Sequence, residues 1–533
     1  MLALLLLAGC SAALAEAQPE KIKLTAIGTE HSRCPDYSEM PVWKKIADEA
    51  GVEIQWEIVR SDWATRRSTI LGTNNLPDLW VGEWNLDIAH IQSNKEAFLK
   101  LNDYIEGSTN VKKMFEDVPE LKTLVTFPDG SIYSIPSYSP SNSRLTGDAV
   151  FINKAWLDKL GLPVPTTLDE FYDTLVAFKT KDPNGNGKAD EIPLVDAKDS
   201  ISFFANAYGI DQNTDLDWFV VDDNNNISWA GDTEAYKNAV KYLEKIYKNG
   251  LCDPETFTQP WQDYYAYCDQ DDAVCGVGFA YTIDALCPKH KDEYVYLAPL
   301  AGPDGHRGAN KSGALARPIS FAISASCKNP DAAWRVIETA YKPEYSIQLT
   351  YGEFGDHGSE KVGLVQNPDG TYDITKPPEG MNWDVWMIAG TSFYARGYVS
   401  AEMFSKIHPS EQMLENEKID ALYKPFMPKH VMPSCYIFDE AINDELSVLK
   451  TDITSLMSSR LADWCQGARN IDNDWDAYLS ELQTYGIERY KQIYFDRYNA
   501  EKANSAASAK PADASAQPAD AAAPADNVSG KEN

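Results

Sequence analysis

The strongest constraint on the fold is a regular alternation of strand-like and helix-like segments near the start of the chain. The apolar spacing predicts strands at residues 22–27, 52–58 and 76–81 and helices at residues 42–50 and 66–71. Strands that alternate with helices are typical of an α/β domain with a mainly parallel sheet. Ligands of such sheets bind beyond the carboxyl ends of the strands, so we expect residues 28–30 and 82–84 to lie near a ligand.

Length and charge exclude several classes of function. The chain has 533 residues, of which 44% are hydrophobic, so it can bury the cores of two or more domains. It carries 48 Lys and Arg against 80 Asp and Glu, a net charge of −32. This charge repels nucleic-acid phosphates and anionic lipid surfaces, and we therefore expect no nucleic-acid partner.

Both ends of the chain differ from its centre. Residues 2–8 are apolar but too few to span a bilayer, and they lead into Leu7-Ala8-Gly9-Cys10, the order found in bacterial lipoprotein signals. We predict that Cys10 is lipidated and anchors the protein outside the cytoplasm, although Ala13-Leu14-Ala15 also offers an ordinary signal-peptidase site. Residues 501–533 are rich in Ala, Pro and Asp and predict a disordered tail.

A polar loop at residues 182–191 has the spacing of a calcium site. Oxygen-bearing side chains occupy loop positions one, three, five and nine, with Gly187 at position six, as in an EF-hand. Pro193 replaces the usual glutamate at position twelve, so Glu191 would take that role. The predicted ligands of a structural Ca²⁺ are Asp182, Asn184, Asn186, Lys188, Asp190 and Glu191. The alternative is a polar hairpin with two Asn-Gly turns.

Other motifs are weak. The sequence has no Gly-x-Ser-x-Gly, His-Glu-x-x-His or complete phosphate loop, so we predict a protein that is not an enzyme. Besides Cys10 there are eight cysteines without a Cys-x-x-Cys pair, which argues against structural zinc. Disulfides and buried thiols are equally compatible with their spacing.

Several segments together resemble one protein family. They are residues 129–136 (DGSIYSIP), 155–162 (AWLDKLGL), 165–171 (PTTLDEF), 247–254 (YKNGLCDP) and 474–478 (DWDAY). In this order, and with the calcium-like loop among them, they resemble the extracellular solute-binding proteins of carbohydrate ABC transporters. The likeness extends to the branch that includes the alginate-oligosaccharide binders.

The resemblance implies an α/β, two-lobed, periplasmic-binding-protein-like fold with an interlobe hinge and a ligand cleft. It implies a monomer that captures an oligosaccharide and delivers it to the permease subunits of an importer. The expected divisions are a signal and anchor segment at 1–18, a first lobe at 19–148 plus 298–356, a second lobe at 149–297 plus 357–500, and the tail at 501–533.

Sugar binding requires aromatic rings beside polar groups, because pyranose rings present flat C–H faces and many hydroxyls. The chain supplies 14 Trp and 28 Tyr. Three tryptophans at helical core spacing, Trp43, Trp156 and Trp334, are assigned to packing. The predicted ligand-binding residues are Glu30, Trp63, Arg66, Trp84, Trp261, Tyr281, Tyr351, Glu353, Trp383, Trp386 and Tyr394.

Two other functions are compatible with the sequence: a secreted glycan-cleaving enzyme with an aromatic cleft, and a peptide receptor on a similar scaffold. The charge of the sugar also stays open. Arg60, Arg66, Arg67 and Arg144 either form a basic patch for uronic acids or pair with neighbouring acids. We favour a neutral oligosaccharide.

Overall fold

The computed structural model describes residues 21–30, 34–140, 145–195, 201–213, 218–253, 255–258, 261–311, 316–356, 361–378, 383–392, 394–433 and 436–508. The signal segment 1–18 with Cys10, the side chain of Arg144, and residues 509–533 of the expected tail lie outside this part. None of its helices combines the length and the apolar character needed to cross a bilayer.

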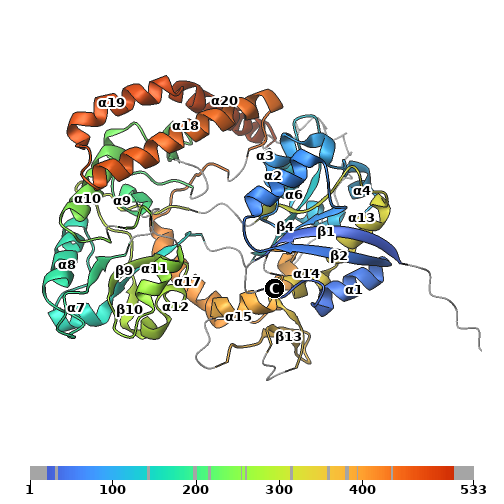
Figure 1. Cartoon of the computed structure of the whole chain (residues 1–533), viewed down its shortest axis with the longest axis horizontal. Coiled ribbons are helices and arrows are strands. Elements are labelled where there is room, and N and C mark those ends of the chain that lie inside the picture. The colour runs from blue at the N-terminus through green and yellow to red at the C-terminus, as the bar shows by residue number, and fades with distance from the viewer. Residues whose placement is uncertain are drawn as a thin grey trace, which may run out of the picture.

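Figure 1 shows two lobes side by side. The first contains a five-stranded sheet in the order β2 (Val52–Val59), β1 (Ile22–Thr29), β3 (Leu79–Val81), β11 (Ala316–Ile323) and β4 (Ser134–Tyr138). β1 is parallel to β2 and β3, as the alternating pattern predicts, whereas β11 is antiparallel to both of its neighbours. The two predicted helices form α1 (Pro41–Ala50) and α2 (Trp63–Thr73).

The second lobe is built on a four-stranded sheet in the order β10 (Tyr294–Tyr296), β5 (Ala149–Asn153), β9 (Cys275–Ala280) and β6 (Ile192–Leu194). β5 and β9 are buried along their whole lengths. This explains their continuous apolar sequences, because both faces of these strands are covered.

The chain crosses between the lobes several times. It leaves the first lobe after β4 and returns at β11, and residues 397–399 then run beside β4, where the N–H of Val399 donates to the carbonyl of Tyr138 at 2.9 Å. α17 (Glu411–Tyr423) lies in the second lobe, with the Tyr423 hydroxyl donating to the Leu297 carbonyl at 2.8 Å. Part of the segment expected in the second lobe therefore lies against the first sheet. The exact domain boundaries stay a prediction.

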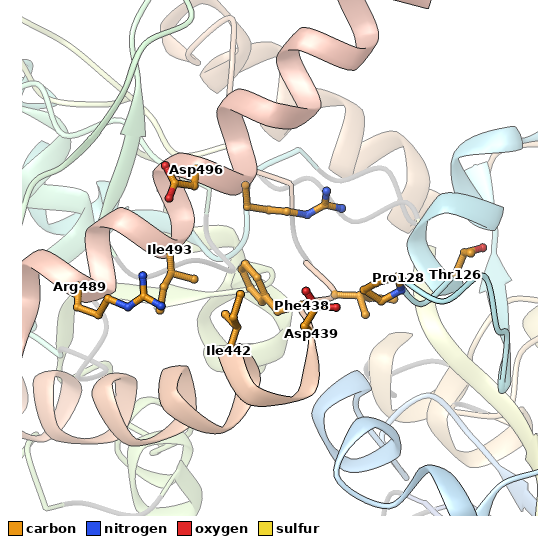
Figure 2. Close-up of a pocket in the computed structure, with 10 residues that line it drawn as sticks. Thr126, Pro128, Phe438, Asp439, Ile442, Arg489, Ile493 and Asp496 are labelled. Carbon is orange, nitrogen blue, oxygen red and sulfur yellow. The ribbon is translucent and has the colours of Figure 1, made fainter.

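A second contact joins the lobes beside the C-terminal helices. The side chain of Gln92, at the end of α3 (Ile88–Gln92), donates to the carbonyl of Phe438. Ile437 packs in a first-lobe cluster that includes Phe127, whereas the adjacent Phe438 packs in the core of the second lobe. A cavity of about 400 Å³ lies at this contact (Figure 2). Two consecutive residues thus connect the two cores.

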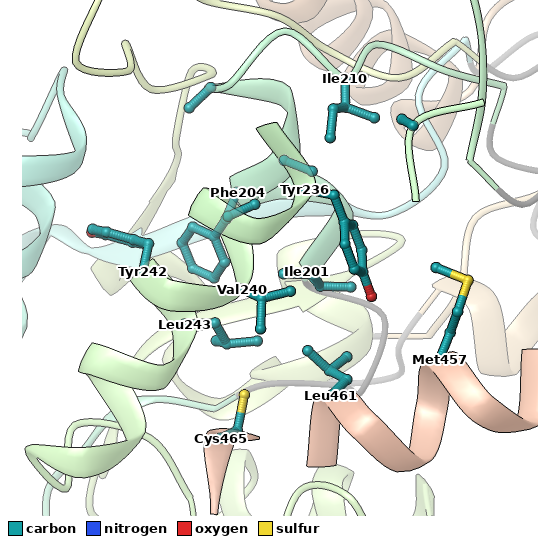
Figure 3. Close-up of a cluster of buried hydrophobic side chains, with 14 of the residues drawn as sticks. Ile201, Phe204, Ile210, Tyr236, Val240, Tyr242, Leu243, Met457, Leu461 and Cys465 are labelled. Carbon is teal, nitrogen blue, oxygen red and sulfur yellow. The ribbon is translucent and has the colours of Figure 1, made fainter. Parts of the chain in front are cut away.

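The C-terminal helices close one side of the second lobe. α18 (Glu440–Cys465) and α19 (Ile471–Thr484) pack against α10 (Glu234–Lys248), and α20 (Ile487–Ser508) packs against α18 and α19. Figure 3 shows Val240 and Leu243 facing Leu461 and Cys465 in this core. α20 continues through Ser508, so the segment expected as a tail begins as helix.

The tryptophans assigned to packing confirm that prediction. Trp43, Trp156 and Trp334 are buried, and the Trp43 ring packs against Tyr37 and Trp56 at centroid distances of 5.4 and 5.0 Å. No disulfide joins the described cysteines, all of which are buried.

Asn85 ties together the ends of β1 and β3. Its fully buried side chain accepts a hydrogen bond from the Thr29 N–H at 2.6 Å and donates to the carbonyls of Ile27 and Val81. These backbone groups lie where the ladder between the two strands ends, and buried backbone groups need partners. One amide therefore replaces the hydrogen bonds that the sheet no longer provides.

We predict that Asn85→Ala lowers the free energy of unfolding by about 3 kcal/mol, because it leaves buried donors and acceptors without partners. Urea denaturation followed by tryptophan fluorescence measures this loss. Asn249→Ala, at the exposed end of α10, is the control and should change stability by less than about 0.5 kcal/mol. Equal effects of the two substitutions would contradict the assigned role.

Candidate functional site

The candidate site lies at the carboxyl edge of the first sheet. β3 and β4 run in the same direction because both are antiparallel to β11 between them, and β1 is parallel to β3. The ends of these three strands therefore share one edge, and the chain leaves for the second lobe from the end of β4 at Tyr138. Residues that follow β1 and β3 consequently lie on the side where the lobes are joined.

Two buried carboxylates hold a remote segment at this edge. Glu30, which is 2% exposed, accepts hydrogen bonds from the Tyr37 hydroxyl at 2.7 Å and from the Tyr394 N–H at 3.2 Å. The N–H of Glu83 donates to the Tyr394 carbonyl at 2.7 Å, and the Glu83 side chain accepts from the Ser137 hydroxyl at 2.5 Å. Both backbone groups of Tyr394 are thus bonded to residues that follow the strands.

Trp84 provides the exposed aromatic surface of the site. Its side chain is 52% exposed, and the Tyr394 ring packs against it edge-on at a centroid distance of 6.1 Å. The Arg317 guanidinium, at the start of β11, lies 4.8 Å from the centre of the Trp84 ring. A ring next to a guanidinium and a phenol can bind the C–H face of a sugar and hydrogen-bond its hydroxyls.

Burial and the neighbouring Glu30 both raise the pKa values of the two phenols at this edge. Burial raises the pKa of Tyr37 well above its ordinary value, and the neighbouring Glu30 raises it further. Burial is also the main reason that the pKa of Tyr394 is raised, with Glu30 again contributing. Both hydroxyl groups therefore remain neutral donors at physiological pH.

Other predicted residues near this edge have structural partners. The Trp63 indole N–H donates to the Asn85 carbonyl at 3.0 Å. Arg66 forms two hydrogen bonds to Glu57 at 2.6 and 2.8 Å, and Arg60 pairs with Asp36 at 3.1 Å. Arg60 and Arg66 therefore pair with neighbouring acids, the alternative to a basic patch for uronic acids.

The remaining predicted residues do not form part of the surface around Trp84. Tyr351 is buried with its hydroxyl 3.2 Å from Ser139 Oγ, and Glu353 accepts from the Val42 N–H at 2.8 Å in the first turn of α1. Trp383 and the buried Trp386 lie on α15 (Trp383–Gly390). Tyr281 lies in the second lobe, where its side chain is 40% exposed and its hydroxyl accepts from the Asn416 amide. Trp261 begins α11 (Trp261–Cys268), but its side chain lies outside the described residues.

Sequence reasoning missed Tyr37, Asn85 and Arg317. Arg317 precedes an apolar strand segment, but only the antiparallel direction of β11 brings it to the edge where β1 and β3 end. The position of Asn85 just beyond β3 was the available signal for its role.

The calcium-like loop folds around its first aspartate. Asp182 accepts hydrogen bonds from the N–H groups of Gly185 at 2.9 Å and Gly187 at 3.1 Å. Gly187 has φ of 76°, in the left-handed region that the sharp turn at position six requires. The side-chain amides of Asn184 and Asn186 donate to Asp190 at 3.1 and 3.0 Å. The side chains at positions three and five therefore converge on position nine, while the side chain at position one bonds to the backbone of the turn.

Glu191 completes this arrangement. One of its oxygens is buried and accepts no hydrogen bond. Burial, together with Asp182 and Asp190, raises the pKa of its carboxyl. A cation would relieve this repulsion and satisfy the oxygen, so the carboxylates of Asp182, Asp190 and Glu191 fit Ca²⁺, which takes oxygen ligands. Within the described chain, no three His, Cys, Asp or Glu side chains are already arranged for a metal ion.

Comparisons with known proteins agree with the fold. The profile of the family described as bacterial extracellular solute-binding protein matches residues 35–347, more than half of the chain. The fructooligosaccharide ABC transporter substrate-binding protein FusA of Streptococcus pneumoniae is 28% identical over 486 residues, 88% of each chain.

Solved structures extend this similarity. The structure of FusA in complex with kestose has a TM-score of 0.82 at 27% identity and covers 90% of this chain and all of that chain. Another structure is described as a FusA EF-hand mutant in complex with fructo-nystose. An HMO-binding solute-binding protein from Bifidobacterium longum infantis has a TM-score of 0.78 at 25% identity, covering 90% of this chain and 99% of its own. The alginate-binding protein AlgQ2, at 19% identity and a TM-score of 0.71, shares the fold.

We predict that Glu191→Gln stabilises the metal-free protein at pH 7. The folded state keeps the Glu191 proton to a higher pH than the unfolded state, so ionisation lowers the stability of the wild type as pH rises above about 4.3. Thermal denaturation in a chelator at pH 4 and pH 7 measures the effect. The melting temperature of Glu191→Gln relative to the wild type should be higher at pH 7 than at pH 4. Glu417→Gln, on the exposed side of α17, is the control and should not show this increase.

Proposed function

Because the chain belongs to the bacterial extracellular solute-binding proteins, we propose that it is the substrate-binding component of an ABC importer for oligosaccharides. The observation that carries the proposal is the exposed Trp84 ring, beside Tyr394 and Arg317, at the edge where the lobes are joined. The similarity to FusA, a fructooligosaccharide-binding protein, and to the HMO-binding protein supports this class of ligand.

In this proposal the protein binds its ligand without changing it. An oligosaccharide stacks on Trp84 of the first lobe and reaches residues of the second lobe, among which Tyr281 is exposed. A ligand that contacts both lobes stabilises the closed arrangement, because its affinity for that arrangement is higher. The permease then recognises the closed lobes.

The proposal also covers where the protein is anchored and which metal ion it holds. A lipid on Cys10 would hold the protein outside the cytoplasmic membrane, near the permease. A structural Ca²⁺ in the loop at 182–191 would stabilise the second lobe, a role supported by the buried Glu191 oxygen and by the EF-hand named in a FusA structure.

We predict that a neutral oligosaccharide such as kestose raises the melting temperature. A hundredfold excess over the dissociation constant stabilises a binding protein by about 2.7 kcal/mol. Trp84→Ala should weaken binding by at least about tenfold, because stacking on the exposed ring is lost. Tyr485→Ala, which removes an exposed aromatic ring between α19 and α20, is the matched control.

The panel for this test also contains an acidic oligogalacturonide and short peptides. Chromatography after incubation should recover the bound glycan intact, and cleavage would favour the enzyme alternative. A shift with peptides alone would reject the oligosaccharide proposal.

We predict that Ca²⁺ raises the melting temperature of the chelator-treated protein and that Asp182→Ala or Glu191→Gln removes this rise. Asp222→Asn is the control, since Asp222 also accepts backbone N–H bonds within a polar turn but lies outside the loop. It should keep the calcium-dependent rise. A rise that survives in both loop variants would place the ion elsewhere.

A further inference from the structure

The cavity between the lobes is separate from the edge that carries Trp84. Residues 126 and 128 of the first lobe line one side, and residues from α18, α20 and the segment before α18 line the other. Its volume of about 400 Å³ lies within the range of small-molecule sites. The lining residues are Thr126, Pro128, Ile437, Phe438, Asp439, Ile442, Arg489, Ile493, Asp496 and Arg497.

The lining combines an apolar patch with a charged rim. Figure 2 shows Phe438, Ile442 and Ile493 grouped between α18 and α20, with Asp439 beside Pro128. An apolar patch within reach of polar groups is the environment that a sugar ring requires, since its C–H face and its hydroxyls need different partners.

Two charged groups on the rim form no ion pair with another described residue. Asp439 is the N-cap residue of α18, yet its side chain makes no capping hydrogen bond. The Nε of Arg497 is buried without a hydrogen-bond partner, and no described carboxylate pairs with this guanidinium, which lies 5.4 Å from the Tyr436 ring centre. Arg489 differs, because it bonds twice to Glu445 at 2.9 and 2.8 Å. The Asp439 carboxylate and the Arg497 guanidinium are therefore left without an ion-pair partner among the described residues.

The cavity is connected to the Trp84 edge by one short helix. α3 begins a few residues after Trp84, and its last residue, Gln92, donates to the carbonyl of Phe438. A glycan that occupies both places would have to pass α3. Both sites are bordered by the first lobe on one side.

We propose that this cavity is a distal subsite for a further sugar unit of the same oligosaccharide. The ring packs against Phe438 and Ile493, its hydroxyls donate to Asp439, and Arg497 donates to its oxygens. One available group of each charge suits a neutral sugar better than a uronic acid. This inference rests on the proposed function and adds that glycan length determines affinity, because only longer chains fill the cavity and connect the lobes there.

The test compares a short and a long neutral oligosaccharide of one linkage type, kestose and a fructan of five or six units, by calorimetry. The wild type should bind the longer chain at least about tenfold more tightly, as expected for a few added hydrogen bonds. Arg497→Gln, which removes the donor, and Ile442→Trp, which fills the cavity, should abolish this preference and leave kestose binding unchanged. Arg469→Gln, an exposed arginine between α18 and α19, is the control and should keep the preference.

Equal affinity of the wild type for both lengths, or a preference that survives in both cavity variants, would overturn the subsite while leaving the proposed function intact. Absence of binding to glycans of either length would instead reject the proposed function, and the subsite with it.

Discussion

The hydrogen bonds of one buried amide organise the ligand edge of the first lobe. Asn85 satisfies backbone groups at the carboxyl ends of both β1 and β3, and its own carbonyl accepts from the Trp63 indole. Without it, the two strand ends would bury unpaired donors and acceptors. Because Trp84 directly precedes Asn85, the orientation of the exposed ring depends on this same set of bonds.

Buried acids complete this edge in an unusual way. Glu30 and Glu83 are buried carboxylates that accept hydrogen bonds from the hydroxyls of Tyr37 and Ser137, and Glu30 also accepts from the Tyr394 N–H. Burying a carboxylate is costly unless donors surround it. One donor to Glu30, Tyr37, is only seven residues away, whereas the other, Tyr394, comes from a distant segment, so satisfying the charge of Glu30 brings Tyr394 beside Trp84.

The sequence predicted the elements better than the site. The strands and helices between residues 22 and 81 follow from apolar periodicity, and Glu30, Trp84 and Tyr394 do meet at one edge. Sequence alone could not show that Glu353 accepts a bond in the first turn of α1, or that Arg317 faces Trp84. Both depend on which distant segments pack together, and neighbouring polar residues do not reveal that.

The contact at residues 437 and 438 bears on how the lobes move. Ile437 is buried among first-lobe residues and Phe438 among second-lobe residues, so separating the lobes here exposes one of them or bends the chain before α18. Exposing a buried isoleucine costs about 1.5–3 kcal/mol. The packing therefore already favours contact between the lobes at this point, which lowers the binding energy that a ligand must contribute to keep them together.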